Sequence, residues 1–327
     1  MTTTDPECTE STASVRKGWA ALTAEERIDY INALHCLAEK PPIYDIKEYP
    51  GVRNRWDDFV AQDSHQLHTN IHFNGILLPW HRNFVQLWET ALREECGYKG
   101  YQPYWDWPSN SLVLAGSPHF DSSETSLSGN GEYDEHAERD LTLPRGTGGG
   151  CVQSGPFKNH TVNMSPFYDV PGGVFPDNAY DYNPHCLRRD LNSLVSGYCN
   201  SPEVTAALLD APNITEFQAI IDKGLGKVHL NGPHGCAHAC VGSTMGDLWG
   251  AVADPAFFLH HANVDRMWAL WQEKDDETRR VALNGSATIY NAPDTPEVTL
   301  DTELAYGELD EVRNIRDMIN PMEGKFC

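Results

Sequence analysis

Apolar residues recur at helical spacing in several separate stretches of the chain, and strictly alternating stretches are few. The first stretch opens with a capping box from Thr23 to Glu26 and continues with helical periodicity until the prolines at positions 41 and 42 end it. A second stretch begins near Pro79, carries one apolar stripe and reaches its end at Gly97. Both patterns predict α-helices.

The part of the chain after residue 200 contains further sequence signals for helix starts. Ser201 is a cap residue followed by a proline at the first helical position, and a second capping box runs from Thr215 to Gln218. Two more helices are expected, over residues 234–240 and from about residue 255 to 272. Residues 287–290 alternate and include the β-branched Thr288 and Ile289, which predicts a short strand. The chain therefore reads as mainly α: a helical bundle decorated with long loops and a few short strands.

Between Pro108 and Pro184 the helical periodicity disappears and the composition shifts to Gly, Ser, Pro and Asn. We interpret this region as a long looped insertion that shapes a binding mouth, because loops of such length inside compact proteins are usually functional. The total of 327 residues allows two domains or one large domain with long loops.

The chain is strongly acidic, with 24 Lys and Arg against 47 Asp and Glu and a formal charge of -23. Such a charge repels nucleic acids and anionic membrane surfaces, so both are excluded as partners. No apolar run approaches the roughly 18 residues that a membrane-spanning helix needs. The composition therefore predicts a soluble globule.

Sequence features that bear on location point in two directions. The N-terminus lacks the apolar stretch of a signal peptide, which taken literally indicates a cytoplasmic chain. Nine cysteines and three glycosylation sequons, at Asn159, Asn213 and Asn284, are more typical of an exported protein. We therefore expect a secreted, disulfide-bonded glycoprotein whose signal peptide has been removed. Because nine is odd, one thiol is expected to stay unpaired.

The histidines are concentrated in two regions. One holds His65, His68, His72 and His81, and the other holds His229, His234, His238, His260 and His261. His234 and His238 lie four residues apart, so on a helix they share a face and can bind one ion. Pro79 separates His72 from His81, so His72 should precede the helix that carries His81. Because unpaired imidazoles are costly to bury, the two clusters predict two metal ions.

The residues between the histidines indicate which metal binds. Neither residues 65–81 nor residues 234–238 contain Asp or Glu, whereas dinuclear zinc, iron or manganese centres normally recruit bridging carboxylates. Ligation by imidazole alone favours copper. Cys236 would lie about 200° from His234 around a helix, so we expect Cys236 and Cys240 to be structural, as disulfides or free thiols.

Two separated motifs resemble the copper-binding motifs of the type-3 copper family, the tyrosinases and catechol oxidases. The first runs from His72 to Arg82 (HFNGILLPWHR) and the second from Asp254 to Arg266 (DPAFFLHHANVDR). Further similarity covers residues 56–59, 101–107 and 186–191, so the resemblance spans most of the chain and is highly specific. The sequence looks like a short fungal member, a polyphenol oxidase.

The resemblance implies six imidazole ligands for two copper ions. It assigns the first copper to His65, His72 and His81, and the second copper to His234, His238 and His261. The family's usual gap before His72 would fall on Ser64, so His65 departs from the pattern by one residue, and His68 is the alternative. His260 is not expected to bind copper, because the family motif selects the second histidine of the pair.

Two residues beside the ligands, Gly235 and Asn263, are expected in the catalytic site. Family members that hydroxylate monophenols often have Asn immediately after the first ligand of the second copper, where it helps a carboxylate to orient a water molecule. This chain has Gly235 there, which favours oxidation of catechols. Gln218 lies where such a carboxylate would be sought, and we interpret it instead as the third helical residue of its capping box.

The family fold is a four-helix bundle that holds both coppers in its centre. Tyr306 and Gly307 resemble the motif that closes its catalytic domain. The resemblance thus implies that residues 1–327 form a single tyrosinase-like catalytic domain without the C-terminal domain that shields the site in precursor forms. The implied reaction converts o-diphenols to o-quinones, with O₂ as the co-substrate that is reduced to water.

Alternatives remain within and outside this class. Within it, the chain would hydroxylate or oxidise monophenols or o-aminophenols, as tyrosinases do. Outside it, an oxygen carrier would use the same six histidines, and a dinuclear zinc hydrolase is disfavoured by the missing carboxylates. The enzymatic alternatives within the family act on small phenols with O₂, and the sequence leaves the preferred phenol and the oligomeric state open.

Overall fold

The computed structural model describes residues 8–9, 12–69, 71–137, 143–165, 177–225, 232–323 and 326, without the side chains of residues 67–69. The α-helices in these ranges are α1 (Ala24–Glu39), α2 (Arg55–Thr69), α3 (Leu77–Cys96), α4 (Ser193–Cys199), α5 (Pro202–Leu209), α6 (Ile214–Lys223), α7 (Pro233–Val241), α8 (Ser243–Gly246), α9 (Phe257–Glu273), α10 (Asp276–Arg279) and α11 (Ile315–Met318). The strands are β1 (Gly131–Tyr133), β2 (Gly149–Val152), β3 (Thr161–Val162), β4 (His185–Cys186), β5 (Glu303–Leu304) and β6 (Arg313–Asn314). They pair in sequence order as three antiparallel two-stranded sheets. The predicted mainly α architecture with a few short strands is confirmed.

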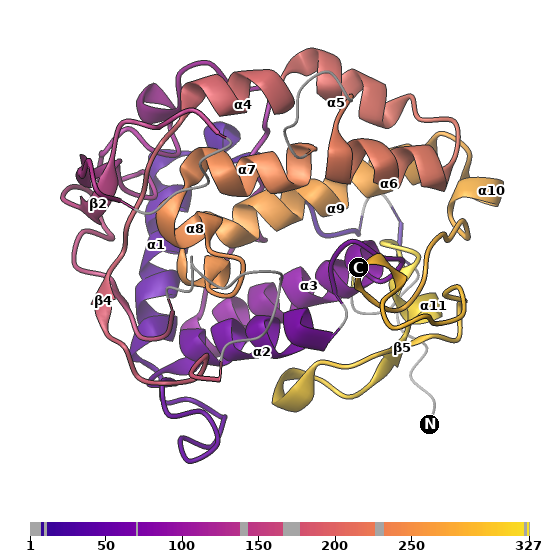
Figure 1. Cartoon of the computed structure of the whole chain (residues 1–327), viewed down its shortest axis with the longest axis horizontal. Coiled ribbons are helices and arrows are strands. Elements are labelled where there is room, and N and C mark those ends of the chain that lie inside the picture. Colours follow the sequence, from indigo (N-terminus) through magenta and orange to yellow (C-terminus); the bar gives the residue numbers. More distant parts are fainter. Residues whose placement is uncertain are drawn as a thin grey trace.

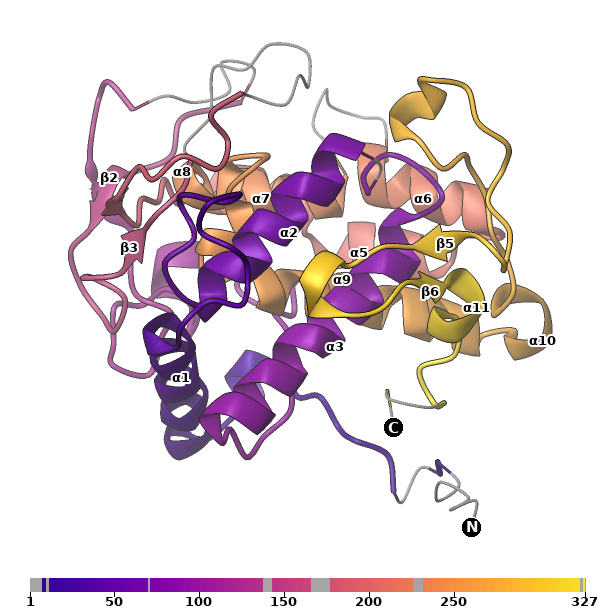
Figure 2. The ribbon, with the colours of Figure 1, turned by 90° about the horizontal axis from the view of Figure 1, so that it is seen from below.

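Helices α2, α3, α7 and α9 form the bundle at the centre of the molecule, as Figures 1 and 2 show from two directions. Large aromatic side chains hold it together. Phe59 of α2 makes edge contacts with Trp88 of α3 and Phe258 of α9, whose rings stack at a centroid distance of 4.0 Å. Because buried aromatic contacts of this size dominate core energetics, they fix the helices that carry most of the histidines relative to one another.

Helix boundaries follow the capping chemistry. The predicted box of α1 is present, since the Thr23 side chain accepts from the backbone N–H of Glu26 and the Glu26 carboxylate accepts from that of Thr23. The second predicted box is wrong by two residues. Helix α6 begins after Asn213, whose side chain accepts from the backbone N–H of Glu216, and Thr215 lies inside the first turn. Asparagine is among the strongest N-cap residues, which explains why the helix begins after Asn213 and not after Thr215.

The predicted strand over residues 287–290 is also wrong. Residues Ile289–Asn291 form a 3-10 turn instead, and Tyr290 and Asn291 have φ values of 51° and 56°. A left-handed backbone at two successive residues ends any extended run, whatever the β propensity of the side chains.

The looped insertion between Pro108 and Pro184 carries strands β1 to β3, and disulfide bonds secure it and the bundle. Cys151–Cys186 joins β2 to β4, Cys36–Cys96 joins α1 to α3, and Cys199–Cys236 joins α4 to α7. Cys8 is also disulfide-bonded. Among the cysteines of the described ranges, Cys240 is a buried free thiol, as the odd count predicts.

No helix within the described ranges combines the length and the apolar character needed to cross a membrane.

Candidate metal centre

Six imidazoles from four segments meet inside the bundle. They are His72 from the segment before α3, His81 from α3, His234 and His238 from α7, and His260 and His261 from α9. Helix α3 begins at Leu77, so His72 precedes the helix that carries His81, as the proline predicts. The rings of His81 and His261 stack with centroids 4.3 Å apart. The two histidine regions, distant in sequence, therefore adjoin in space.

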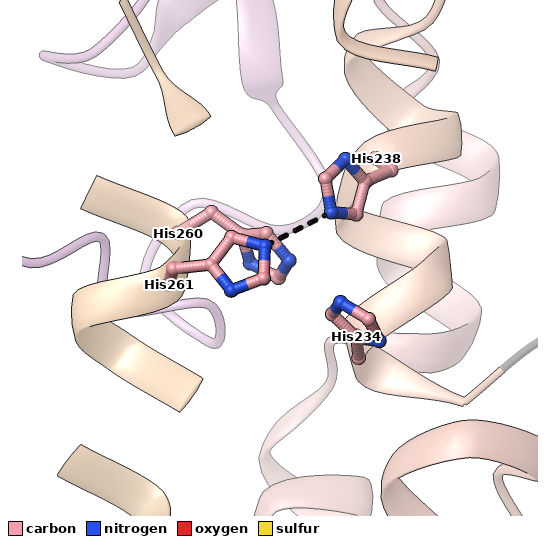
Figure 3. A group of neighbouring side chains, drawn as sticks. All are labelled: His234, His238, His260 and His261. Carbon is pink, nitrogen blue, oxygen red and sulfur yellow. Dashed lines mark hydrogen bonds between the residues drawn. The ribbon is translucent and has the colours of Figure 1, made fainter. Parts of the chain in front are cut away.

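The histidines of α7 and α9 point toward one another across a narrow gap (Figure 3). Their candidate ligand atoms all lie within 4.8 Å of one another, and Nε2 of His238 is 3.3 Å from Nε2 of His261. When two nitrogens bind the same ion, each at about 2.0 Å and at a tetrahedral angle, the nitrogens lie about 3.3 Å apart. The spacing of this pair therefore fits a single metal ion.

Backbone carbonyls orient two of the rings. His81 Nδ1 lies 2.8 Å from the carbonyl oxygen of Leu77, and His238 Nδ1 lies 2.9 Å from that of Met245. If each Nδ1–H donates to its carbonyl, each Nε2 presents a lone pair to the cluster, as a metal ligand requires. Asp265, an acidic candidate for this orienting role, pairs instead with arginines, among them Arg82.

Several buried ring nitrogens lack any hydrogen-bond partner among the described atoms. These are His72 Nδ1, His81 Nε2, His234 Nε2, His260 Nε2 and His261 Nδ1. Burial lowers the pKa of His81 and of His238 to about 3, with neighbouring histidines adding to the effect, so both rings are neutral near pH 7. Because neutral imidazole binds a metal and an unpaired buried nitrogen is costly, the cluster fits transition-metal ions such as copper.

His260 lies in the same cluster but differs from its neighbour. The indole N–H of Trp107 donates to His260 Nδ1 over 3.1 Å. The neutral ring then carries its own proton on Nε2 and presents no lone pair there. This arrangement favours His261 over His260 as a ligand.

His65 lies elsewhere. Its side chain is exposed on α2, and its Nδ1 is 3.4 Å from the Tyr180 hydroxyl. Among the described residues, the ring contacts that connect the cluster do not include it. The side chain of His68 and all of His229 fall outside the described part of the chain.

Asp63 is the buried residue that sequence reasoning missed. It lies on α2 with 2% of its surface exposed, and its Oδ1 is 3.9 Å from His81 Nε2. Burial raises its pKa to about 8. Residues 65–81 contain no carboxylate, and Asp63 lies just before that tract. Its position one helical turn after the apolar Phe59 was the signal that could have found it.

A second carboxylate, Asp222 of α6, adjoins the cluster, 3.9 Å from His234 Nδ1. It lines a pocket of about 440 Å³ together with Phe73 and Tyr290, whose rings stack with centroids 4.9 Å apart. Gln218 also lines this pocket, where it exchanges hydrogen bonds with Asn284, and its predicted role in a capping box is therefore wrong.

The two predicted catalytic residues flank the histidines. Gly235 is half-buried on α7, next to His234. Asn263 of α9 is fully buried, and neither atom of its amide has a partner among the described residues.

Comparison with known proteins agrees with this geometry. Residues 53–274 match the family model of the common central domain of tyrosinase. Tyrosinase P of Aspergillus terreus is 44% identical, over 98% of this chain and 92% of the relative. N-acetyl-6-hydroxytryptophan oxidase of Emericella nidulans is 40% identical, over 98% of this chain and 93% of the relative.

A solved structure shows the same fold. It is a glycine-to-asparagine mutant of the polyphenol oxidase from Thermothelomyces thermophila, 36% identical, with a TM-score of 0.91 over 98% of this chain and 90% of that one. The family match covers more than half of the chain, and the relatives match it along nearly its whole length. The chain therefore belongs to the tyrosinase family of type-3 copper oxidoreductases.

Proposed function

We propose that this protein oxidises o-diphenols to o-quinones at two copper ions, with O₂ as the electron acceptor. Two diphenols each lose two electrons and two protons, and one O₂ becomes two water molecules. The observation that carries the proposal is the meeting of buried imidazoles from α3, α7 and α9 with unpaired ring nitrogens. A copper pair, when bound, supplies the electron exchange between phenol and O₂.

Five imidazoles are the ligands that we propose on geometry and resemblance together. His72 and His81 serve the first copper, and His234, His238 and His261 serve the second. The 3.3 Å spacing of His238 and His261 supports the second group, and the 5.2 Å between the ring centroids of His72 and His81 supports the first.

The pocket beside the cluster has the size and chemistry for one phenol. A volume of about 440 Å³ lies within the range of small-molecule sites, which is about 300 to 1,000 Å³. Phe73 and Tyr290 stack on each other in the wall of this pocket, and together they give an apolar surface against which a phenol ring can pack. Asp222 can accept a hydrogen bond from a substrate hydroxyl or hold a water molecule beside His234.

Gly235 supports catechols over monophenols as substrates. The position after His234 carries no side chain, so it offers no amide to help Asp222 hold a water that would deprotonate a monophenol. The second candidate function is oxidation of a hydroxylated indole or another monophenol. The relative named N-acetyl-6-hydroxytryptophan oxidase favours it.

We also propose that the protein works outside the cytoplasm. Three disulfide bonds join described segments, and such bonds persist in oxidising compartments.

The function is tested with purified protein loaded with copper. We expect two coppers per chain, quinone formation from catechol, and uptake of one O₂ for every two catechols. A monophenol and a 6-hydroxytryptophan derivative, assayed in parallel, decide between the two candidates. Reversible O₂ binding without catechol turnover would instead identify an oxygen carrier, and metal-free protein serves as the blank.

A further inference from the structure

Asp63 differs from the other acidic residues of its own helix. Asp57 accepts hydrogen bonds from two backbone N–H groups and from the Asn163 amide, and Asp58 accepts from two backbone N–H groups and from Arg55. Asp63 is as deeply buried as they are, yet its Oδ1 has no donor among the described residues. A buried carboxyl oxygen without a donor is costly to ionise, so a cation bound beside Oδ1 would stabilise the ionised form of Asp63.

The orientation of His81 shows where that cation would lie. Its Nδ1–H is directed at the carbonyl oxygen of Leu77, which leaves Nε2 with a lone pair. That nitrogen faces Asp63 Oδ1 at 3.9 Å, and neither atom has a hydrogen-bond partner. Two acceptors that face each other at this distance are too far apart to share a proton in a hydrogen bond. One ion bound at about 2.0 to 2.2 Å from each atom spans the gap.

We propose that Asp63 is the third ligand of the first copper, beside His72 and His81, so that the centre holds five imidazoles and one carboxylate. The inference rests on the proposed function, in which this site binds copper. It replaces the predicted role of His65. The two residues are two apart on α2 and therefore point in directions about 200° apart, so the helix cannot present both to one ion. Asp63 faces the bundle, and His65 is exposed.

Copper binding by matched variants tests the assignment directly. Asp63→Asn keeps the size of the side chain and removes its charge, and His65→Ala removes the competing imidazole. Each protein is loaded with copper, analysed for copper per chain and titrated with a competing chelator. We expect Asp63→Asn to bind one of its two coppers at least about tenfold more weakly, since even residues outside the ligand set cost 10- to 100-fold. His65→Ala should keep two coppers at wild-type affinity.

Thermal unfolding gives a readout that does not depend on activity. Without metal, Asp63→Asn should melt close to the wild-type temperature, because the substitution keeps the size of the side chain. Copper should raise its melting temperature less than it raises that of the wild type, because less binding energy is available to the folded state. If Asp63→Asn does not fold, Asp63→His takes its place, and it should bind two coppers with an altered copper spectrum.

The outcomes separate the two proposals. Wild-type copper affinity in Asp63→Asn, or an unaltered spectrum in Asp63→His, would overturn the role of Asp63, as would loss of one copper in His65→Ala. Wild-type protein that still binds two coppers and oxidises catechol would leave the proposed function standing in each of these cases. Wild-type protein that binds fewer than two coppers would overturn the proposed function itself.

Discussion

Trp107 donates its indole N–H to Nδ1 of His260 over 3.1 Å, and this contact distinguishes two adjacent histidines that are equally buried. Nδ1 of His260 acts as an acceptor, so the proton of the neutral ring sits on Nε2. Among the described residues no indole donates to His261, and its Nε2 approaches that of His238 to 3.3 Å. His260 and His261 therefore differ in which ring nitrogen is free to bind a metal. Helical periodicity alone does not distinguish these two residues.

The first prediction concerns this pair. His261→Ala should lose one copper and reduce catechol oxidation by more than about 100-fold, which exceeds the cost of losing an outer hydrogen-bond partner. His260→Ala should retain two coppers, and it is the matched control because both residues lie buried on α9. Copper analysis and an O₂ electrode provide the measurements. Loss of one copper from His260→Ala and not from His261→Ala would reverse the assignment.

The second prediction concerns His119, which lies outside the cluster. It is buried against Trp19 and Trp105, neither ring nitrogen has a partner among the described atoms, and burial lowers its pKa to about 3. The unfolded chain takes up this proton near pH 6.5, whereas the folded chain resists it until about pH 3. The free energy of unfolding therefore falls as the pH drops through this window, by about 1.4 kcal/mol per pH unit.

His119→Phe removes both the titration and the unpaired nitrogens. We expect the variant to be at least as stable as the wild type at pH 7.5 and to lose less stability between pH 6 and pH 4. Urea unfolding at several pH values, at equal metal content, measures the difference. His136→Ala, at an exposed position, should follow the wild type. Parallel pH curves for His119→Phe and wild type would show that His119 does not contribute.

The sequence predicted those helices that carry a capping motif or a regular apolar stripe. The box from Thr23 to Glu26 begins α1 where the sequence indicates, and residues 234–240 lie within α7. Helix α2 could not be found this way, because its buried face carries acidic residues. Asp58 is acceptable in the interior because the Arg55 side chain pairs with it and the backbone N–H groups of Ile43 and Tyr44 reach it from another segment.

In the site, too, local sequence cannot reveal contacts with distant segments. The spacing of His234 and His238 predicts a shared helix face, and the structure places both rings in one cluster. Spacing could not choose between Asp63 and His65, since the choice depends on which face of α2 meets α3. The sequence favours His65 as a ligand because it lies one residue from the position that the family motif expects. Asp63 becomes a candidate only once the structure shows that it is buried.

The third prediction concerns the ion pair between Arg189 and Asp254, which is fully buried and bidentate, with both contacts at 2.8 Å. Asp254 also accepts from the backbone N–H of Ala256, just before α9. Arg189→Met should destabilise the protein by about 3 to 5 kcal/mol, because it leaves a buried carboxylate without its cation. Arg316→Met, which breaks an exposed pair with Asp301, should cost less than about 1 kcal/mol. Thermal or urea unfolding compares them, and equal losses would contradict the prediction.

The fourth prediction tests the role of Gly235. Gly235→Asn places an amide next to His234, whose ring adjoins the carboxylate of Asp222, and we expect amide and carboxylate together to hold a water molecule that deprotonates a monophenol. The change is compatible with the helix, since asparagine is no worse a helix former than glycine. The rate of monophenol hydroxylation relative to catechol oxidation should rise between tenfold and about 100-fold, at or below what a positioned general base contributes. Gly235→Ala should show no rise, because it adds a methyl group without an amide. Adding Asp222→Asn to the asparagine variant should abolish the gain, and a gain that survives this second change would show that another group holds the water.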